Sequence, residues 1–165
     1  MKQINQYITE KFKINSKTTK QPYKYFPETR SELIELLEEK LKEDKDADLN
    51  DIDVSKITDM SSLFSENTFS LDPHNIHIEK WDMSNVINIS EMFSGCENFN
   101  CDISNWNVSN VKMMNYVFYD CKSFDCDLSK WNVGKVERWN NIFGGDCGIK
   151  DKEEYKPKFN WKNVK

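Results

Sequence analysis

The chain has 165 residues, of which 38% are hydrophobic and 13% aromatic, with a formal net charge of -5. This length fits one domain with a sizeable core, and the composition excludes a disordered chain. No run approaches the roughly 18 apolar residues of a membrane-spanning helix, and the first residues lack the apolar stretch of a secretory signal.

The charge is unevenly distributed along the chain. Residues 1–30 carry seven basic and two acidic side chains, whereas residues 54–149 carry thirteen acidic and seven basic ones. A nucleic-acid-binding domain concentrates positive charge on its folded surface, where the phosphates dock. The distribution therefore argues against direct binding to nucleic acid.

The N-terminal part divides into a leader segment and a helix. Residues 1–28 are rich in lysine and end near a proline, and we interpret them as a leader. Within residues 29–51, Thr29 and Glu32 have the spacing of a capping box, and leucines then follow at helical intervals. This pattern predicts a helix that caps the first repeat.

The central part repeats every 25 residues. Trp81, Trp106 and Trp131 mark the period, and an earlier copy begins at Ile52 after allowance for four extra residues. Other positions keep the same interval: Phe93/Phe118/Phe143, Val86/Val111/Val136, Cys96/Cys121 and Cys101/Cys126. A period of this length is typical of stacked repeats, in which each unit covers the apolar face of its neighbour, so we expect the recurring tryptophans and phenylalanines to form the core. We therefore assign residues 52–149 to a repeat domain and residues 150–165 to a C-terminal cap or tail.

Two periodicities alternate inside each repeat. Val86, Ile89, Met92 and Phe93 have the spacing of one helical face, whereas Cys101 and Ile103 alternate with polar residues as in a strand. The sequence thus predicts an α/β repeat fold. It would be a short leucine-rich-repeat solenoid with one parallel strand and one short helix per repeat and an N-terminal capping helix.

The repeated motif is similar to that of a known family. Trp-Asp/Asn-Val-Ser-Asn-Val, then Met-x-x-Met/Val-Phe, then Cys-x-x-Phe-x-x-Asp-Ile/Leu-Ser resembles the BspA-like leucine-rich-repeat family of bacterial surface proteins over about residues 52–149. The upstream Pro-x-Thr-Arg-x-Glu-Leu-Ile segment also fits this family. The resemblance implies a non-enzymatic repeat at the bacterial cell surface, acting in adhesion or host interaction.

The cysteines are expected to be buried free thiols. Cysteine is readily buried as a small hydrophobe, and two side chains in one stacked column point the same way, which disfavours a disulfide. Zinc is disfavoured because His77 shares the column of Asp102 and Asp127, opposite in parity to Cys101 and Cys126. No calcium-loop spacing occurs either, so we expect neither a metal nor a cofactor.

The outward-facing columns are the candidate partner-binding site. They comprise Asn75, Asn100 and Asp125; His77, Asp102 and Asp127; and Glu79, Ser104 and Ser129. One interpretation is an acidic docking surface for a basic protein segment. The other is an ordinary solvated face whose aspartates make local hydrogen bonds. Tyr116, Tyr119 and Arg138 offer a second contact surface on the helix side, because tyrosine and arginine are favoured binding anchors.

The sequence predicts no enzyme, since it has only two histidines, no nucleophile with a neighbouring base and no phosphate-binding glycine loop. We predict a protein-binding module for a partner with a basic surface, acting at a bacterial surface as the resemblance implies. One alternative, suggested by the acidic balance and the absence of an export signal, is an intracellular or phage-borne inhibitor that occludes a basic surface of a nucleic-acid enzyme. Another is a structural module of a longer surface array. The oligomeric state and the partner's identity stay open.

Overall fold

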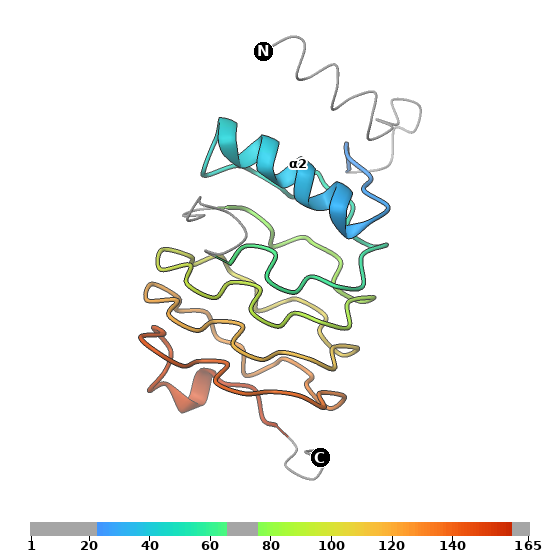
Figure 1. The fold of residues 1–165 in the computed structure, drawn as a ribbon. Helices are drawn as coiled ribbons and strands as arrows, with labels where there is room; N and C mark the ends of the chain where they lie inside the picture. The colour runs from blue at the N-terminus through green and yellow to red at the C-terminus, as the bar shows by residue number, and fades with distance from the viewer. Residues whose placement is uncertain (1–22, 66–75, 160–165) are drawn as a thin grey trace.

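The structure, a computed structural model, describes residues 23–65 and 76–159. Within these ranges the chain forms one α-helix, α2 (Arg30–Glu43), and one short 3₁₀-helix, η1 (Glu153–Tyr155). The rest consists of turns and loops that wind into a stack of superimposed, ring-like turns of chain below α2 (Figure 1). We call each turn of the stack a rung; the described residues of the four rungs are 52–65 with 76–80, 81–105, 106–130 and 131–149.

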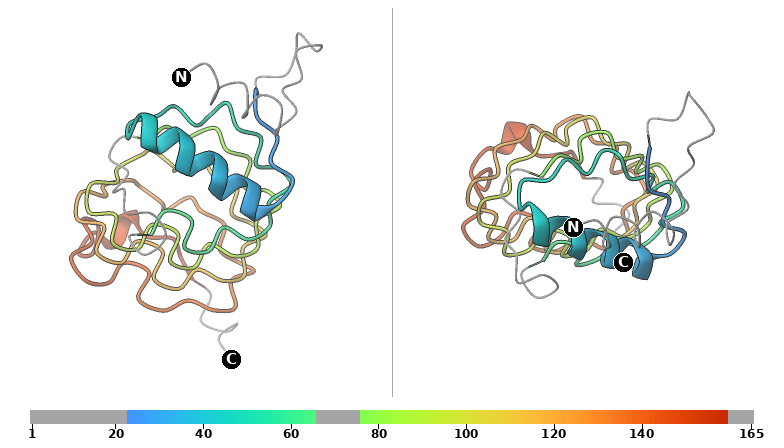
Figure 2. Two further views of the ribbon diagram at one scale, coloured as in Figure 1. Left: turned by 45° about the horizontal axis from the view of Figure 1, so that its top comes forward. Right: turned by 90° about the horizontal axis from the view of Figure 1, so that it is seen from above.

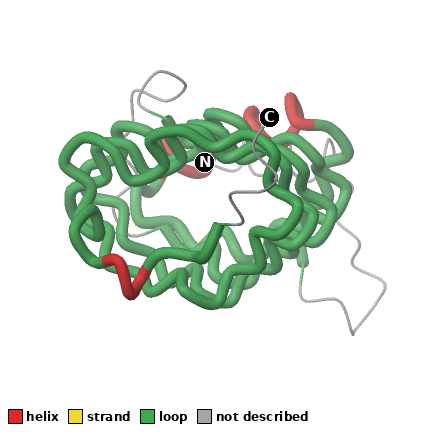
Figure 3. Tube along the Cα trace, turned by 90° about the horizontal axis from the view of Figure 1, so that it is seen from below, coloured by secondary structure: helices red, strands yellow, loops and turns green. Residues whose placement is uncertain are grey.

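The predicted leucine-rich-repeat solenoid, with a strand and a helix in each repeat, is wrong. Within the described residues the rungs contain no α-helix, and strand-type pairing between neighbouring rungs is limited to isolated parallel bridges. Three of these bridges follow one another down the stack, joining Asp59 to Asn88, Asn88 to Met113 and Met113 to Arg138. Such single bridges form no sheet, as the tube of Figure 3 shows.

Successive turns explain why the spacing of apolar residues in each repeat resembled that of a helix. The backbone N–H of Val86 donates to the carbonyl of Met83, that of Met92 to Ile89 and that of Cys96 to Phe93. Both ends of each turn are buried, so apolar residues recur three positions apart as they do on a helix. The backbone of Glu91 is left-handed, with φ 58°, and this prevents the turns from merging into a helix.

Like side chains stack on like between the rungs. The rings of Phe64, Phe93, Phe118 and Phe143 form one column with centroid separations of 5.5, 5.7 and 5.8 Å and nearly parallel planes. A second column pairs Phe99 with Phe124 at 5.8 Å. Three tryptophan side chains are also buried, in agreement with the prediction that they form the core.

The tryptophans also hold neighbouring rungs together through hydrogen bonds. Each indole N–H donates to a backbone carbonyl of the preceding turn of chain: Trp81 to Leu49, Trp106 to Ile78 and Trp131 to Ile103, at 2.9, 3.1 and 3.1 Å. Because the indole packs and donates at once, this position specifies tryptophan more strongly than packing alone would.

The helix α2 lies across the first rung (Figure 2). Its N-cap is Thr29, whose hydroxyl accepts from the Glu32 N–H at 3.2 Å, while the Glu32 carboxylate accepts from the Glu28 N–H at 2.8 Å. The leucines predicted to form its apolar face are all buried: Leu33, Leu36, Leu37 and Leu41. This end of the stack is therefore covered.

The other end of the stack is partly covered by the segment that follows the last rung. Phe159 stacks on Trp139 with a centroid separation of 4.6 Å, and the Leu128 N–H donates to the Tyr155 carbonyl at 2.8 Å. Trp161, which belongs to the predicted C-terminal cap or tail at residues 150–165, and most of the leader lie outside the described residues.

Candidate protein-binding face

The predicted outward columns come together on one side of the stack. His77 forms a parallel bridge with Asp48, and Asp102 and Asp127 follow in the next two rungs. All eight of the predicted residues that the structure describes are exposed or half-buried; Asn75 lies outside the described residues. We call this surface the acidic face. It comprises Asp46, Asn100 and Asp125; Asp48, His77, Asp102 and Asp127; and Asn50, Glu79, Ser104 and Ser129.

Three of these residues were missed by the sequence analysis, and they extend the face by one step towards α2. Asp46, Asp48 and Asn50 precede the first rung, and the Leu49 N–H donates to the His77 carbonyl at 2.9 Å. The signal was present in the sequence, since Asp-Ala-Asp-Leu-Asn at 46–50 aligns with Asn-Ile-His-Ile-Glu at 75–79. The four extra residues before Trp81 concealed that alignment.

The aspartates of the central column are held by local hydrogen bonds. The Oδ1 atom of Asp102 accepts from the Ser104 N–H at 3.1 Å, and that of Asp127 accepts from the Ser129 N–H at 2.9 Å. Asp48 accepts from the Asn50 N–H in the same way, at 3.0 Å. These Asx turns fix the direction of each carboxylate.

The hydrogen bonds at Asp102 and Asp127 favour the ionised form of these two carboxyl groups. Bonds from the Ser104 side chain and backbone N–H lower the pKa of Asp102, and bonds from the Ser129 backbone N–H and side chain lower that of Asp127. Donors that bind the ionised form of a carboxyl group stabilise it. The local-hydrogen-bond interpretation is thus correct for these two residues, and their carboxylates nevertheless remain exposed and ionised.

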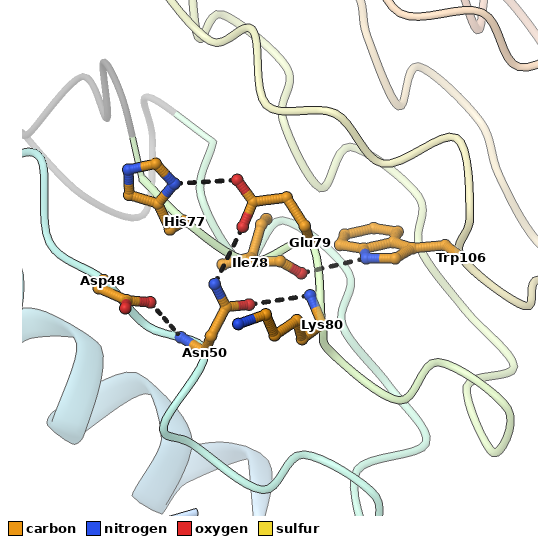
Figure 4. Close-up of polar contacts among 7 residues, drawn as sticks. All are labelled: Asp48, Asn50, His77, Ile78, Glu79, Lys80 and Trp106. Atoms are coloured by element: carbon orange, nitrogen blue, oxygen red, sulfur yellow. Dashed lines mark hydrogen bonds and ion pairs between the residues drawn. The ribbon is translucent and has the colours of Figure 1, made fainter. Parts of the chain in front are cut away.

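A small polar cluster replaces the Asx turn in the first of the four rungs (Figure 4). Asn50 donates through Nδ2 to Glu79 Oε2 at 2.9 Å and accepts through Oδ1 from the Lys80 N–H at 2.8 Å. Glu79 Oε1 lies 2.9 Å from His77 Nδ1. The bond to Glu79 raises the pKa of His77, whereas burial raises the pKa of Glu79 but is outweighed by the bonds from Asn50 and His77, which lower it.

A shallow pocket of about 390 Å³ lies in the acidic face between the second and third rungs. Its lining includes Asn100, Asp102, Asp125 and two buried thiols, of which Cys126 donates to Asp102 Oδ1 at 3.5 Å. Asp125 forms an ion pair with Lys152. The pocket therefore presents carboxylates at its rim and sulfur at its floor.

The thiols are unsuited to nucleophilic chemistry. Burial raises the pKa of Cys101 to about 12 and that of Cys126 to about 11, so both stay protonated near neutral pH. All five cysteines are buried and free, as predicted. Across residues 23–65 and 76–159, no group of three His, Cys, Asp or Glu side chains is placed to hold a metal ion.

The second predicted surface is a smaller feature. Tyr116 and Tyr119 are half-buried and contact each other edge to face at 5.8 Å, and Asn140 donates to the Tyr116 hydroxyl at 3.3 Å. Arg138 is exposed and bridges to Met113 through its backbone. The tyrosines thus pack on each other within the third rung, and both are only partly exposed.

Comparison with known proteins identifies a family without a known function. No curated protein and no solved structure matches the chain. None of the helical segments that the structure describes has the length and apolar character needed to cross a membrane. The family model described as "Mycoplasma protein of unknown function, DUF285" matches residues 33–154, which include all but the first turn of α2 and all four rungs. The chain therefore belongs to this DUF285 family.

Proposed function

We propose that the chain is a non-enzymatic protein-binding module whose acidic face captures a basic segment of a partner. The observation that carries the proposal is the central column of the face, where Asp102 and Asp127 in two successive rungs present ionised carboxylates fixed by Asx turns. Side chains already held in their binding orientation lose little conformational entropy when a partner docks. A lysine- or arginine-rich segment supplies the complementary charge.

The repeated motif supports a binding role, and the raised pKa values of Cys101 and Cys126 argue against these thiols as nucleophiles. Repeats built of packing columns create an extended surface without a catalytic centre. The resemblance to bacterial surface repeats favours a partner on a host or on another cell. Long-range attraction between exposed charges is screened by salt, so binding through this face weakens as ionic strength rises.

The structure allows the charge to be removed without disturbing the turns. The triple variant Asp102→Asn, Asp125→Asn, Asp127→Asn removes three negative charges. Asparagine keeps the Oδ1 acceptors of the Asx turns at Asp102 and Asp127, and at Asp125 it removes the charge that pairs with Lys152. The matched control is Asp82→Asn, at an Asx turn with Ser84 on another part of the rung. Lysine at positions 102 and 127 would instead remove the side-chain acceptors of the Asx turns. A loss of capture could then result from unfolding and not from the loss of charge.

The test is capture from lysates of the source cell and of host tissue, repeated with an arginine- and lysine-rich peptide as a defined probe. We expect the wild type and Asp82→Asn to capture the same basic protein, and the triple variant to lose it. Equal capture by the triple variant would show that the acidic face is not the interface. A captured nucleic-acid enzyme would favour the inhibitor alternative over a surface role.

A further inference from the structure

In the residues that lead up to each phenylalanine of the column, the backbone hydrogen bonds between neighbouring rungs run in one direction. The N–H groups of Met114, Tyr116 and Phe118 donate to the carbonyls of Arg138, Asn140 and Ile142 at 3.0, 2.8 and 2.9 Å. The preceding rungs repeat this pattern, with Glu91 donating to Asn115 and Phe93 to Val117. In this segment each rung thus offers its carbonyls to the rung before it and its N–H groups to the rung after it. At the preceding residues the direction is reversed, since Lys112 donates to Ile87 and Glu137 donates to Lys112.

The pattern stops at the fourth rung with its donors directed past the end of the stack. Asn141 and Phe143 occupy the positions of Tyr116 and Phe118, and their backbone N–H groups have no acceptor within the described residues. A row of unpaired donors at alternate residues resembles the edge of a sheet, which pairs readily with an added extended segment.

The aromatic column ends at the same edge. Phe143 stacks on Phe118 at 5.8 Å, and its outer side borders a pocket of about 700 Å³. The apolar part of the lining is Trp139, Phe143, Pro157 and Phe159. Phe143 is only partly buried, whereas Phe93 and Phe118, which have a rung on both sides, are fully buried. The Lys156 ammonium lies over this ring, with its Nζ 5.8 Å from the ring centroid. The edge therefore offers two unpaired backbone donors and a ring face that a partner's side chain reaches by displacing a lysine side chain.

We propose that this edge binds an extended segment of a partner protein in the position that a fifth rung would take. The segment's alternate carbonyls accept from Asn141 and Phe143, and an aromatic side chain stacks on the Phe143 ring. The interface continues the contact between rungs, with the same donors and the same ring spacing of 5.5 to 5.8 Å. Main-chain hydrogen bonds would supply affinity, and the aromatic pocket would supply specificity.

The charged residues of the pocket and the position of α2 indicate which kind of segment this edge binds. Lys156 and Glu153 form an ion pair in the pocket lining. Lys150 and Lys158 against Glu154 leave an excess of one positive charge, which favours a carboxylate next to the aromatic residue. A second copy of the chain does not fit end to end, because α2 covers its first rung. The partner segment is therefore extended, aromatic and acidic.

The chain's own third rung supplies a defined probe. A fluorescein-labelled peptide with the sequence of residues 113–120, Met-Met-Asn-Tyr-Val-Phe-Tyr-Asp, has the carbonyl spacing, the phenylalanine and the acidic residue. We expect saturable binding to the full-length chain by fluorescence anisotropy, and slower amide exchange of Asn141 and Phe143 when the peptide is bound. A peptide with alanine in place of its phenylalanine should bind at least about tenfold more weakly, the loss expected for an aromatic anchor.

Variants of the chain separate this edge from the acidic face. Phe143→Leu should weaken peptide binding about threefold or more, because leucine keeps apolar volume but loses the ring stack. A thermal melt confirms that this variant is folded at the assay temperature. The triple Asp→Asn variant should bind the peptide as the wild type does. No saturation up to about 1 mM peptide, or equal binding of the alanine peptide, overturns the proposal. So does binding that appears only in Trp161→Ala, since the chain's own end would then be the occupant.

Discussion

Replacement of Trp106 tests the packing argument most directly. Its side chain is 5% exposed, and its ring centroid lies 6.5 Å from that of Trp131 and 6.2 Å from that of Phe93. Its Nε1 donates to the Ile78 carbonyl at 3.1 Å, so the residue joins two rungs through packing and through a hydrogen bond.

Two substitutions separate those contributions. Trp106→Ala removes both, and large buried aromatic residues replaced by alanine lower the free energy of unfolding by about 3–5 kcal/mol. Trp106→Phe keeps most of the apolar contact but leaves the Ile78 carbonyl without its donor, which costs about 1–2 kcal/mol. With a urea m-value near 2 kcal/mol/M, the alanine variant should lose roughly 2 M in its unfolding midpoint.

The assay is urea unfolding followed by the fluorescence of the remaining tryptophans. Asn105→Ala, at the adjacent exposed position, is the control and should stay within about 0.5 kcal/mol of the wild type. A loss below about 1 kcal/mol for Trp106→Ala would refute the view that the tryptophan column is core. Equal losses for alanine and phenylalanine would show that the hydrogen bond, and not the packing, dominates.

Three further predictions concern titratable groups. The buried thiols, including Cys101 and Cys126, should react with Ellman's reagent only after unfolding, because burial keeps their pKa values near 12 and 11; rapid reaction in the native state would contradict this. The pKa of His77 is raised by Glu79, so its contribution to stability is present below its unfolded pKa and is lost as pH rises through the folded value. In an NMR titration Glu79→Gln should lower that pKa, and an unchanged value would exclude the contact. The pKa of Asp127 is lowered, so its contribution is present above its unfolded pKa and is lost as pH falls through the folded value; urea unfolding between about pH 6 and pH 2 should show a smaller acid loss for Asp127→Asn than for the wild type.

The sequence predicted which side chains are buried and which are exposed better than it predicted the backbone conformation. The 25-residue period placed Trp106 and Phe93 in the core, and the alternation of Cys101 with Asp102 separated a buried position from an exposed one. Both inferences depend only on which residues recur and which alternate. They hold whether the segment is a strand or, as here, a series of turns.

The backbone could not be predicted because two structures share one apolar spacing. Buried residues three apart arise from a helical face and equally from consecutive turns whose first and last residues are both buried. The left-handed backbone at Glu91 and Tyr116 decides between them, and neither residue type signals such a conformation. The missed extension at Asp46 and Asp48 has a different cause, an insertion that displaced the register by four residues.

The stacking of identical side chains makes the rungs equivalent building units. Phe93 stacks on Phe118 with almost the same geometry as Phe118 stacks on Phe143, so the aromatic contact is nearly the same in these two pairs of neighbouring rungs. A gene duplication of one 25-residue unit would therefore insert a compatible rung without requiring compensating changes elsewhere. Length can evolve by copying and surface charge by single substitutions, so a lineage can change what such a protein recognises while leaving its core untouched.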